Sequence, residues 1–336
     1  MQKRLYYIAL IAILLLAACG KTNEAEVPSE GESDGQALSV YTTVYPLQYF
    51  TERIGGEHVD VQSIYPPGAD EHTFDPTQKD MMALADSDLF FYIGLGLEGF
   101  VENAQKTLKG EHVNMIATAE GISEDLLQEG HDNEHDEETE HDEHDNEAAH
   151  DEHDGHDHHH GEFDPHVWIS PVLSIELATS IKDALIEEMP DMKDDFEKNF
   201  QQLNDDLVEL DNKFKEMANA APSKTFFVSH AAFGYIADAY GLEQIAIAGL
   251  NSQSEPSQKQ LAALVAQAKE LNVKYVLFEQ NVSSKLTDVI RKEIGAESLM
   301  LHNLGVLTAD DVKNNEDYIS LMEHNIETLS KALGNE

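Results

Sequence analysis

The chain has 336 residues, of which 65 are acidic and 21 are basic, so its formal net charge at pH 7 is −44. A negative field of this size repels nucleic acid and anionic lipid headgroups and attracts cations, which excludes a nucleic-acid-binding role. The length exceeds that of an ordinary single domain, so we expect two domains, each able to bury its own core.

The first 18 residues have the pattern of an export signal. Lys3 and Arg4 form a basic start, and the apolar run 5–15 is shorter than the roughly 20 residues that span a bilayer as a helix. The only cysteine, Cys19, follows Leu-Ala-Ala. This motif resembles a lipobox, which implies cleavage before Cys19 and a lipid anchor on its sulfur. A plain secretory signal is the alternative, and both predict an extracytoplasmic protein.

Strand and helix patterns alternate from residue 38 onward. The first half has predicted strands at 38–44, 59–65, 89–93 and 113–116, and predicted helices at 46–54, 75–85, from 98 and at 172–189. The second half has predicted strands at 225–229, 245–248, 273–278 and 299–301, and predicted helices at 231–240, 256–271, 283–294 and 315–333. Apolar strands that alternate with helices predict mostly parallel sheets covered on both faces, which is an α/β fold.

A long amphipathic helix is predicted at 191–218, where apolar residues recur at threes and fours. Its length is on the order of 40 Å, roughly the diameter of a domain. We therefore expect a rigid linker helix, 189–220, that joins an N-terminal lobe, 38–188, to a C-terminal lobe, 221–336. Such an arrangement leaves a cleft between the lobes.

Two segments lack hydrophobic periodicity. Residues 19–37 are rich in Glu, Ser and Gly and predict a flexible tether. Residues 130–161 contain no hydrophobic residue beyond two alanines, so they cannot offset the entropy of ordering and predict a mobile insertion. Either its histidines are incidental to a solubilising insertion, or they offer many weak metal sites: His131, His135, His141, His144, His150, His153, His156, His158, His159 and His160.

Four residues outside this insertion are candidates for one folded metal site. His72 lies in a polar turn after the second strand, His166 follows a proline and precedes the only tryptophan, and His230 and Glu279 each follow an apolar strand. Ligands of open α/β sheets bind at the carboxyl ends of the strands. Three imidazoles and one carboxylate suit zinc at nearly tetrahedral geometry, whereas manganese is better served by more oxygen ligands.

Four motifs carry a family resemblance: Gly68–Pro76, Asp164–Trp168, Val228–Tyr235 and Phe278–Asn281. Together they resemble the zinc-binding lipoproteins of bacterial ABC uptake systems. The resemblance implies two α/β lobes bridged by a long helix, one metal ion in the cleft, and delivery of that ion to a membrane permease. It also implies that three histidines are ligands, namely His72, His166 and His230.

The resemblance also bears on the metal and on the fourth ligand. Manganese and iron relatives usually carry a carboxylate where this chain has His230, which favours zinc as the transported ion. The fourth position varies within the family between water and a carboxylate, so Glu279 is the least secure of the predicted ligands. The histidine-rich tract resembles the low-complexity loops of zinc-specific members, which are expected to assist metal acquisition.

Two other functions are alternatives to zinc delivery. A manganese-binding protein or adhesin of the same family is the first alternative. A secreted zinc hydrolase is the second, but the sequence has no His-Glu-x-x-His helix and no nucleophile elbow, so we expect no enzyme. A monomer is expected.

Overall fold

The computed structural model describes residues 37–130, 163–254, 256–280 and 285–334. The predicted signal, Cys19, most of the tether and the ten histidines of the insertion lie outside these ranges. Residues Ala37–Glu336 form one compact unit. The division of this unit into lobes with the predicted bounds stays a prediction.

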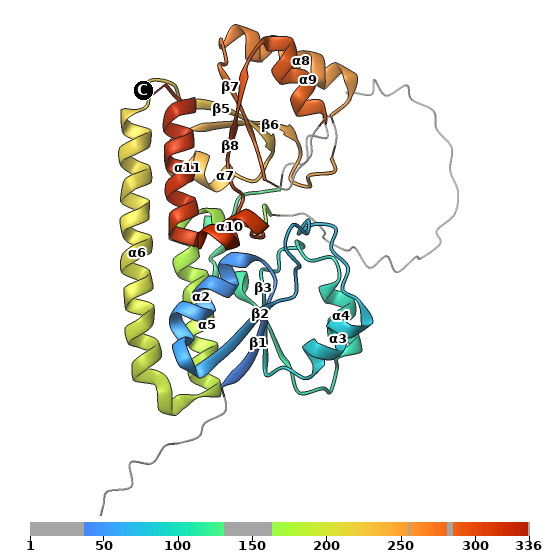
Figure 1. Ribbon diagram of the computed structural model, residues 1–336, viewed down its shortest axis with the longest axis vertical. Coiled ribbons are helices and arrows are strands. Elements are labelled where there is room, and N and C mark those ends of the chain that lie inside the picture. The colour runs from blue at the N-terminus through green and yellow to red at the C-terminus, as the bar shows by residue number, and fades with distance from the viewer. Residues whose placement is uncertain (1–36, 131–162, 255, 281–284, 335–336) are drawn as a thin grey trace, which may run out of the picture. The chain divides into compact units, whose positions relative to one another are not determined.

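Two four-stranded parallel sheets form the framework of this unit (Figure 1). The first has the order β2-β1-β3-β4 and the second the order β6-β5-β7-β8. In each sheet the second strand of the chain pairs with one side of the first strand, and the third strand pairs with its other side. The strand order therefore reverses between the two central strands, and a topological switch point lies at their carboxyl ends. The strands are β1 (Leu38–Thr42), β2 (Val59–Ser63), β3 (Leu89–Tyr92), β4 (Asn114–Ala117), β5 (Thr225–His230), β6 (Glu243–Ala248), β7 (Tyr275–Phe278) and β8 (Glu297–Met300).

The helices follow the predicted pattern with differences at their ends. The α-helices are α2 (Tyr45–Gly55), α3 (Gln78–Ala85), α4 (Val101–Thr107), α5 (Pro171–Glu188), α6 (Lys193–Ala220), α7 (Gly234–Ala239), α8 (Gln258–Glu270), α9 (Lys285–Ile294), α10 (Ala309–Asn314) and α11 (Tyr318–Ala332). The predicted start of α3 at residue 75 was too early, because Thr77 is its N-cap in a capping box with Asp80. The short helix α10 was not predicted, and Asn315 with φ 57° ends it.

The long helix α6 contains 28 residues and its apolar side is buried. It packs against α2 and α5, which belong to the first half, and against α11 of the second half. In Figure 1 it runs beside all three of these helices. The predicted fold class, two parallel sheets flanked by helices and joined by a long helix, is therefore confirmed.

The hydrophobic core continues from one half of the chain into the other. One cluster includes Phe50 and Trp168 from the first half and Tyr318 from α11. The hydroxyl of Tyr318 donates to the backbone oxygen of Trp168 at 2.9 Å. A smaller cluster lies between the second sheet and helices α8 and α9 and includes Phe227 and Ile290. The segment around Trp168 is thus anchored by both halves.

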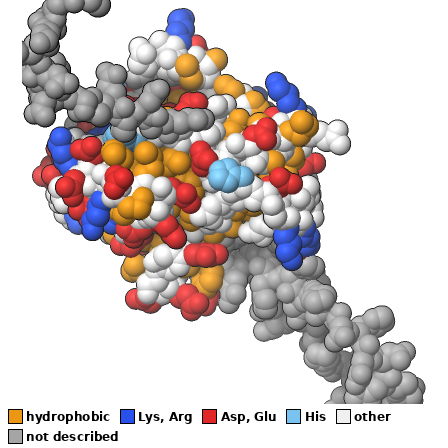
Figure 2. All heavy atoms as spheres, turned by 90° about the horizontal axis from the view of Figure 1, so that it is seen from below, with side chains coloured by type: hydrophobic (Ala, Val, Ile, Leu, Met, Phe, Trp, Pro, Cys, Tyr) orange, Lys and Arg blue, Asp and Glu red, His pale blue; other side chains and the backbone are white. Residues whose placement is uncertain are grey.

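The surface of the unit is strongly acidic. Figure 2 shows one face, on which Asp and Glu side chains are widely scattered while Lys and Arg side chains lie mainly near its margins. Among the residues that the structure describes, no helix combines the length and the apolar character that a membrane crossing requires.

Candidate metal centre

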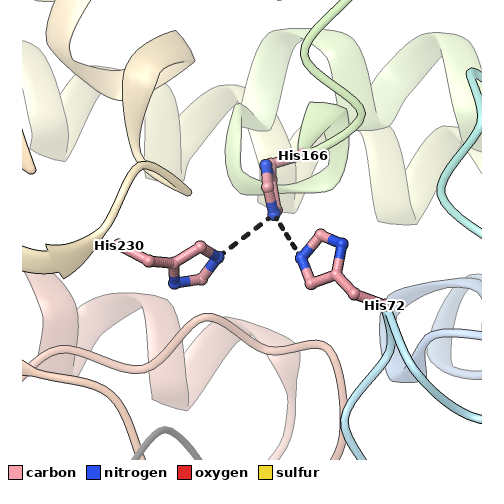
Figure 3. Close-up of side chains that lie close together, drawn as sticks. All are labelled: His72, His166 and His230. Atoms are coloured by element: carbon pink, nitrogen blue, oxygen red, sulfur yellow. Dashed lines mark hydrogen bonds between the residues drawn. The ribbon is translucent and has the colours of Figure 1, made fainter. Parts of the chain in front are cut away.

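Three histidine rings meet in the interior of the molecule (Figure 3). Nε2 of His166 lies 3.2 Å from Nε2 of His72 and 3.4 Å from Nε2 of His230. The rings of His166 and His230 are completely buried, and His72 is half-buried. Within the described ranges, these three side chains form the group whose nitrogens are close enough to share one metal ion. We call them the histidine triad.

His72 is held in its turn by a neighbouring carboxylate. The backbone N–H of His72 donates to Oδ1 of Asp70 at 3.0 Å. The other oxygen of Asp70 accepts from the hydroxyl of Ser252 at 3.0 Å, and Ser252 lies in the loop after β6. The turn that carries His72 is therefore tied to the second half of the chain.

His166 is oriented by Asp164. The residue lies between Pro165 and the short 3-10 helix Val167–Ile169, in a buried segment. Oδ1 of Asp164 accepts from the backbone N–H of His166 at 2.9 Å and lies 2.7 Å from its Nδ1. A carboxylate on Nδ1 fixes the proton there and leaves the lone pair on Nε2, which faces the other two rings.

His230 is the last residue of β5, so the prediction that the strand ends before it was one residue short. Its backbone N–H donates to Oε1 of Glu279 at 3.2 Å, and the hydroxyl of Ser229 donates to the same oxygen at 2.5 Å. Oε2 of Glu279 lies 2.6 Å from Nδ1 of His230. The contact is not in line with the ring N–H, and Nδ1 has no hydrogen bond of good geometry among the described residues.

Glu279 follows β7, as the sequence indicates, and is almost fully buried. Its carboxylate is engaged with Ser229 and with the backbone and Nδ1 of His230, while the triad meets through the Nε2 atoms. The structure therefore brings three of the four predicted ligands together and places the fourth beside one of them. A direct bond from Glu279 to the metal stays a prediction.

Two buried residues at this site were missed by sequence reasoning. Glu71 precedes His72 in the same turn, and Asn303 follows β8; they are 5% and 1% exposed. The amide nitrogen of Asn303 donates to Oε1 of Glu71 at 2.9 Å and to Oε2 of Glu279 at 3.1 Å. For Glu71 the one available signal was its position directly before His72. Nothing in the local sequence marks Asn303.

The pKa values reflect this crowding. Burial and the two neighbouring imidazoles lower the pKa of His72 to about 2, so this ring is neutral at physiological pH. Burial also lowers the pKa of His230, but the adjacent Glu279 outweighs it, and the pKa is raised overall. Burial raises the pKa of Glu279, but His230 outweighs it, and the pKa falls below the ordinary value. A proton on His230 and a charge on Glu279 therefore stabilise each other.

This donor set fits a borderline transition-metal cation. Neutral imidazoles with lone pairs on Nε2 bind zinc at about 2.0–2.1 Å, which at the tetrahedral angle places the ligand nitrogens roughly 3.3–3.4 Å apart. The Nε2 separations of 3.2 and 3.4 Å match this spacing. Without a cation, the lone pairs of these nitrogens face one another in a site with little access to water. Burying hydrogen-bond acceptors without donors costs free energy. Asp164 behind His166 supplies the carboxylate–histidine pairing that raises ligand basicity.

The remaining histidines of the described ranges lie outside the triad. His302 is buried, with Nε2 3.1 Å from Oδ2 of Asp311 and Nδ1 accepting from the backbone of Leu304. His58 packs its ring edge-on against Phe196. His112 and His324 are exposed and lie near carboxylates. These positions have surface or packing roles.

Comparison with known proteins gives a consistent result. Residues 40–332 match the family model ZnuA, described as "Zinc-uptake complex component A periplasmic". The chain is 36% identical over 327 residues to the high-affinity zinc uptake system protein ZnuA of Bacillus subtilis, covering 97% of this chain and 96% of that protein.

Streptococcus pneumoniae provides a longer relative. The zinc-binding lipoprotein AdcA is 35% identical over 337 residues, and the match covers all of this chain but 62% of AdcA, so this chain spans less than two thirds of that protein. The crystal structure of the Zn(II)-bound ZnuA-like domain of AdcA superposes with a TM-score of 0.70 at 33% identity, covering 89% of this chain and 99% of the domain.

Proposed function

Because the chain belongs to the ZnuA family of periplasmic zinc-uptake components, we propose that it captures Zn²⁺ outside the cytoplasm and delivers it to an ABC permease for import. The role is that of a solute-binding protein rather than an enzyme. The match to the ZnuA-like domain of AdcA, which was solved with Zn(II) bound, supports zinc as the cargo. The permease is the partner that this role requires.

The observation that carries the proposal is the convergence of the three Nε2 atoms of the histidine triad, with that of His166 3.2 and 3.4 Å from the other two. We propose that His72, His166 and His230 bind the ion through these atoms. The fourth position goes to Glu279 or to water, and Glu279 would reach it by a rotation away from Nδ1 of His230. Zinc accepts either oxygen at this position.

The location and the accessory segments are part of the proposal. We propose that Cys19 carries a lipid that anchors the chain, as a monomer, to the outer side of the cell membrane; the relative AdcA is named a lipoprotein. The histidines between 131 and 160 would add weak, rapidly exchanging sites. The ends of this insertion meet near the triad, since Glu129 pairs with Phe163 and the backbone N–H of Asp164 donates to Gln128.

Equilibrium dialysis of the mature chain tests the proposal. We expect one tightly bound zinc ion per chain, together with weaker sites that disappear when residues 130–161 are deleted. The deletion should leave the tight site unchanged, because the triad residues lie outside it. Loss of the tight site on deletion, or no tight site in the intact chain, would contradict the proposal.

Zinc binding is expected to release about one proton at pH 6. The raised pKa of His230 and the lowered pKa of Glu279 place a proton on the ring, and the metal must displace it. Below the pKa of His230, each unit of acidification therefore raises the apparent Kd about tenfold, or about 1.4 kcal/mol. Calorimetric titrations in two buffers of different ionisation enthalpy measure the proton count.

Glu279→Gln is the matched control for this prediction. It removes the main charge that raises the pKa of His230. Glu71 and Asp164 raise this pKa less, so burial would favour the neutral ring. We expect the variant to release clearly less than one proton per zinc at pH 6. An identical binding enthalpy of the wild-type chain in both buffers would mean that zinc releases no proton. The prediction that zinc displaces a proton from His230 would then be wrong.

A further inference from the structure

Asn303 joins two buried carboxylates that flank the histidine triad. Its amide nitrogen donates to Oε1 of Glu71 at 2.9 Å and to Oε2 of Glu279 at 3.1 Å. An amide NH₂ group has two hydrogens, so both are used in this bridge. Glu71 comes from the first half of the chain, and Glu279 and Asn303 come from the second. The amide of Asn303 therefore links one carboxylate from each half of the chain.

The rest of Asn303 is fixed by its surroundings. Oδ1 accepts from Nε2 of Gln280 at 2.8 Å and from the backbone of Gly305 at 3.0 Å. The backbone oxygen accepts from the indole N–H of Trp168 at 2.7 Å. The next residue, Leu304, is fully buried with φ 61°, a backbone conformation that residues other than glycine rarely adopt. The network thus holds the amide group in one orientation.

Glycine at position 305 is part of the same arrangement. A Cβ atom at Gly305 would lie 2.8 Å from the carboxylate carbon and from Oε1 of Glu71. The space beside Asn303 is therefore shaped to receive this carboxylate. Burial raises the pKa of Glu71, as expected for an acid held in the interior.

We propose that Asn303 is a positioning residue that sets the metal preference of the site. By holding Glu71 and Glu279, its amide limits how many carboxylate oxygens reach the cation, so that imidazoles dominate the ligand set. Three nitrogens and a single oxygen favour zinc, whereas Mn²⁺ prefers more oxygens and a higher coordination number. The inference rests on the proposed function of the triad as the zinc site.

Removing the amide of Asn303 takes one hydrogen-bond donor away from each of the two carboxylates, Glu71 and Glu279. Buried carboxylates that lose a donor are poorly stabilised, and the nearest compensating charge is the bound cation. We therefore expect Asn303→Leu, which removes both donors with little change in size, to lower the ratio of zinc affinity to manganese affinity at least tenfold. Competition titrations with Zn²⁺ and Mn²⁺ measure this ratio.

Bound Co²⁺ gives a second readout. Four-coordinate Co²⁺ absorbs visible light strongly and six-coordinate Co²⁺ weakly. The wild-type chain should give the intense spectrum, and Asn303→Leu should give the weak one, because additional carboxylate oxygens join the ion. A loss of folding stability alone would not change the coordination number.

Asn325→Leu is a matched structural control. Asn325 is as buried as Asn303. Its side chain makes two hydrogen bonds of 2.7 Å to the backbone of His302, the residue before Asn303. Both variants should melt at lower temperature, but only the substitution at Asn303 should change the metal ratio and the cobalt spectrum. If Asn303→Leu fails to fold, Asn303→Ala is measured in its place.

Two outcomes overturn the inference. One is a zinc-to-manganese ratio in the Asn303 variant within threefold of wild type, and the other is an equal shift in Asn325→Leu. The wild-type titration separates this failure from a failure of the proposed function. A wild-type chain without tight zinc binding refutes both, whereas tight wild-type binding with an unchanged ratio refutes the role of Asn303 alone.

Discussion

Replacing His166 by alanine is expected to weaken zinc binding by more than about 100-fold, since the loss of an outer partner of a metal ligand already costs about 10–100-fold. His166 is the central member of the triad, with Nε2 close to the Nε2 atoms of both His72 and His230. It is completely buried, and Asp164 fixes its orientation. The alanine variant leaves two imidazoles, so a carboxylate or water would have to take the place of the lost nitrogen.

A competition titration against a chromogenic zinc chelator measures the loss, and His58→Ala is the control. His58 also contacts an aromatic core residue, Phe196, but lies outside the triad. We expect His58→Ala to bind zinc with wild-type affinity. Both variants should keep the near-UV circular dichroism of the folded chain. Full tight binding by the His166 variant would mean that the ion is held elsewhere.

Zinc loading is expected to add about 4 kcal/mol to the free energy of unfolding when free zinc is about 1,000 times its Kd. In the proposed site the ion would bind side chains that are brought together only in the folded state, so its binding would add to the free energy of unfolding. For a folded unit of this size, each kcal/mol moves Tm by about 2 °C, which predicts a rise of about 8 °C on loading. Removal of zinc with a chelator should reverse the rise.

Differential scanning calorimetry of the apo and loaded forms measures this shift. Two comparisons make it specific: Mg²⁺, which prefers oxygen ligands and keeps its waters, should leave Tm unchanged, and His166→Ala should lose most of the zinc-dependent rise. Equal Tm values for the apo and zinc-loaded wild-type chain would show that the ion does not bind a site formed by folding.

The site connects the two halves of the chain through several direct bonds. Asp70 accepts from Ser252, Glu71 accepts from Asn303, and the backbone N–H of Tyr45 donates to Gly305 at 2.9 Å. The triad itself combines His72 and His166 of the first half with His230 of the second. We therefore expect metal occupancy to be coupled to how the halves pack, because the same segments carry the triad and these bonds.

Much of the fold and part of the site were predictable from local sequence. The continuous apolar run of β3 and the apolar stripe of α6 could be recognised in the local sequence, because a strand covered on both faces buries every residue and a surface helix buries one stripe. His166 and His230 were recognisable from their neighbours, a proline and a tryptophan in one case and a strand end in the other. The motifs around them also indicated the family, which the family model confirms for residues 40–332.

Other features depended on the tertiary structure. The burial of Glu71 and the placement of the Glu279 carboxylate are not encoded in any local pattern. Asn303 bonds to Glu71 across 232 residues of chain. The sequence by itself predicted most of the elements and the three histidines that the structure brings together. Only packing decided which polar groups are buried together, because a hydrogen bond or a pKa depends on neighbours in space rather than on neighbours along the chain.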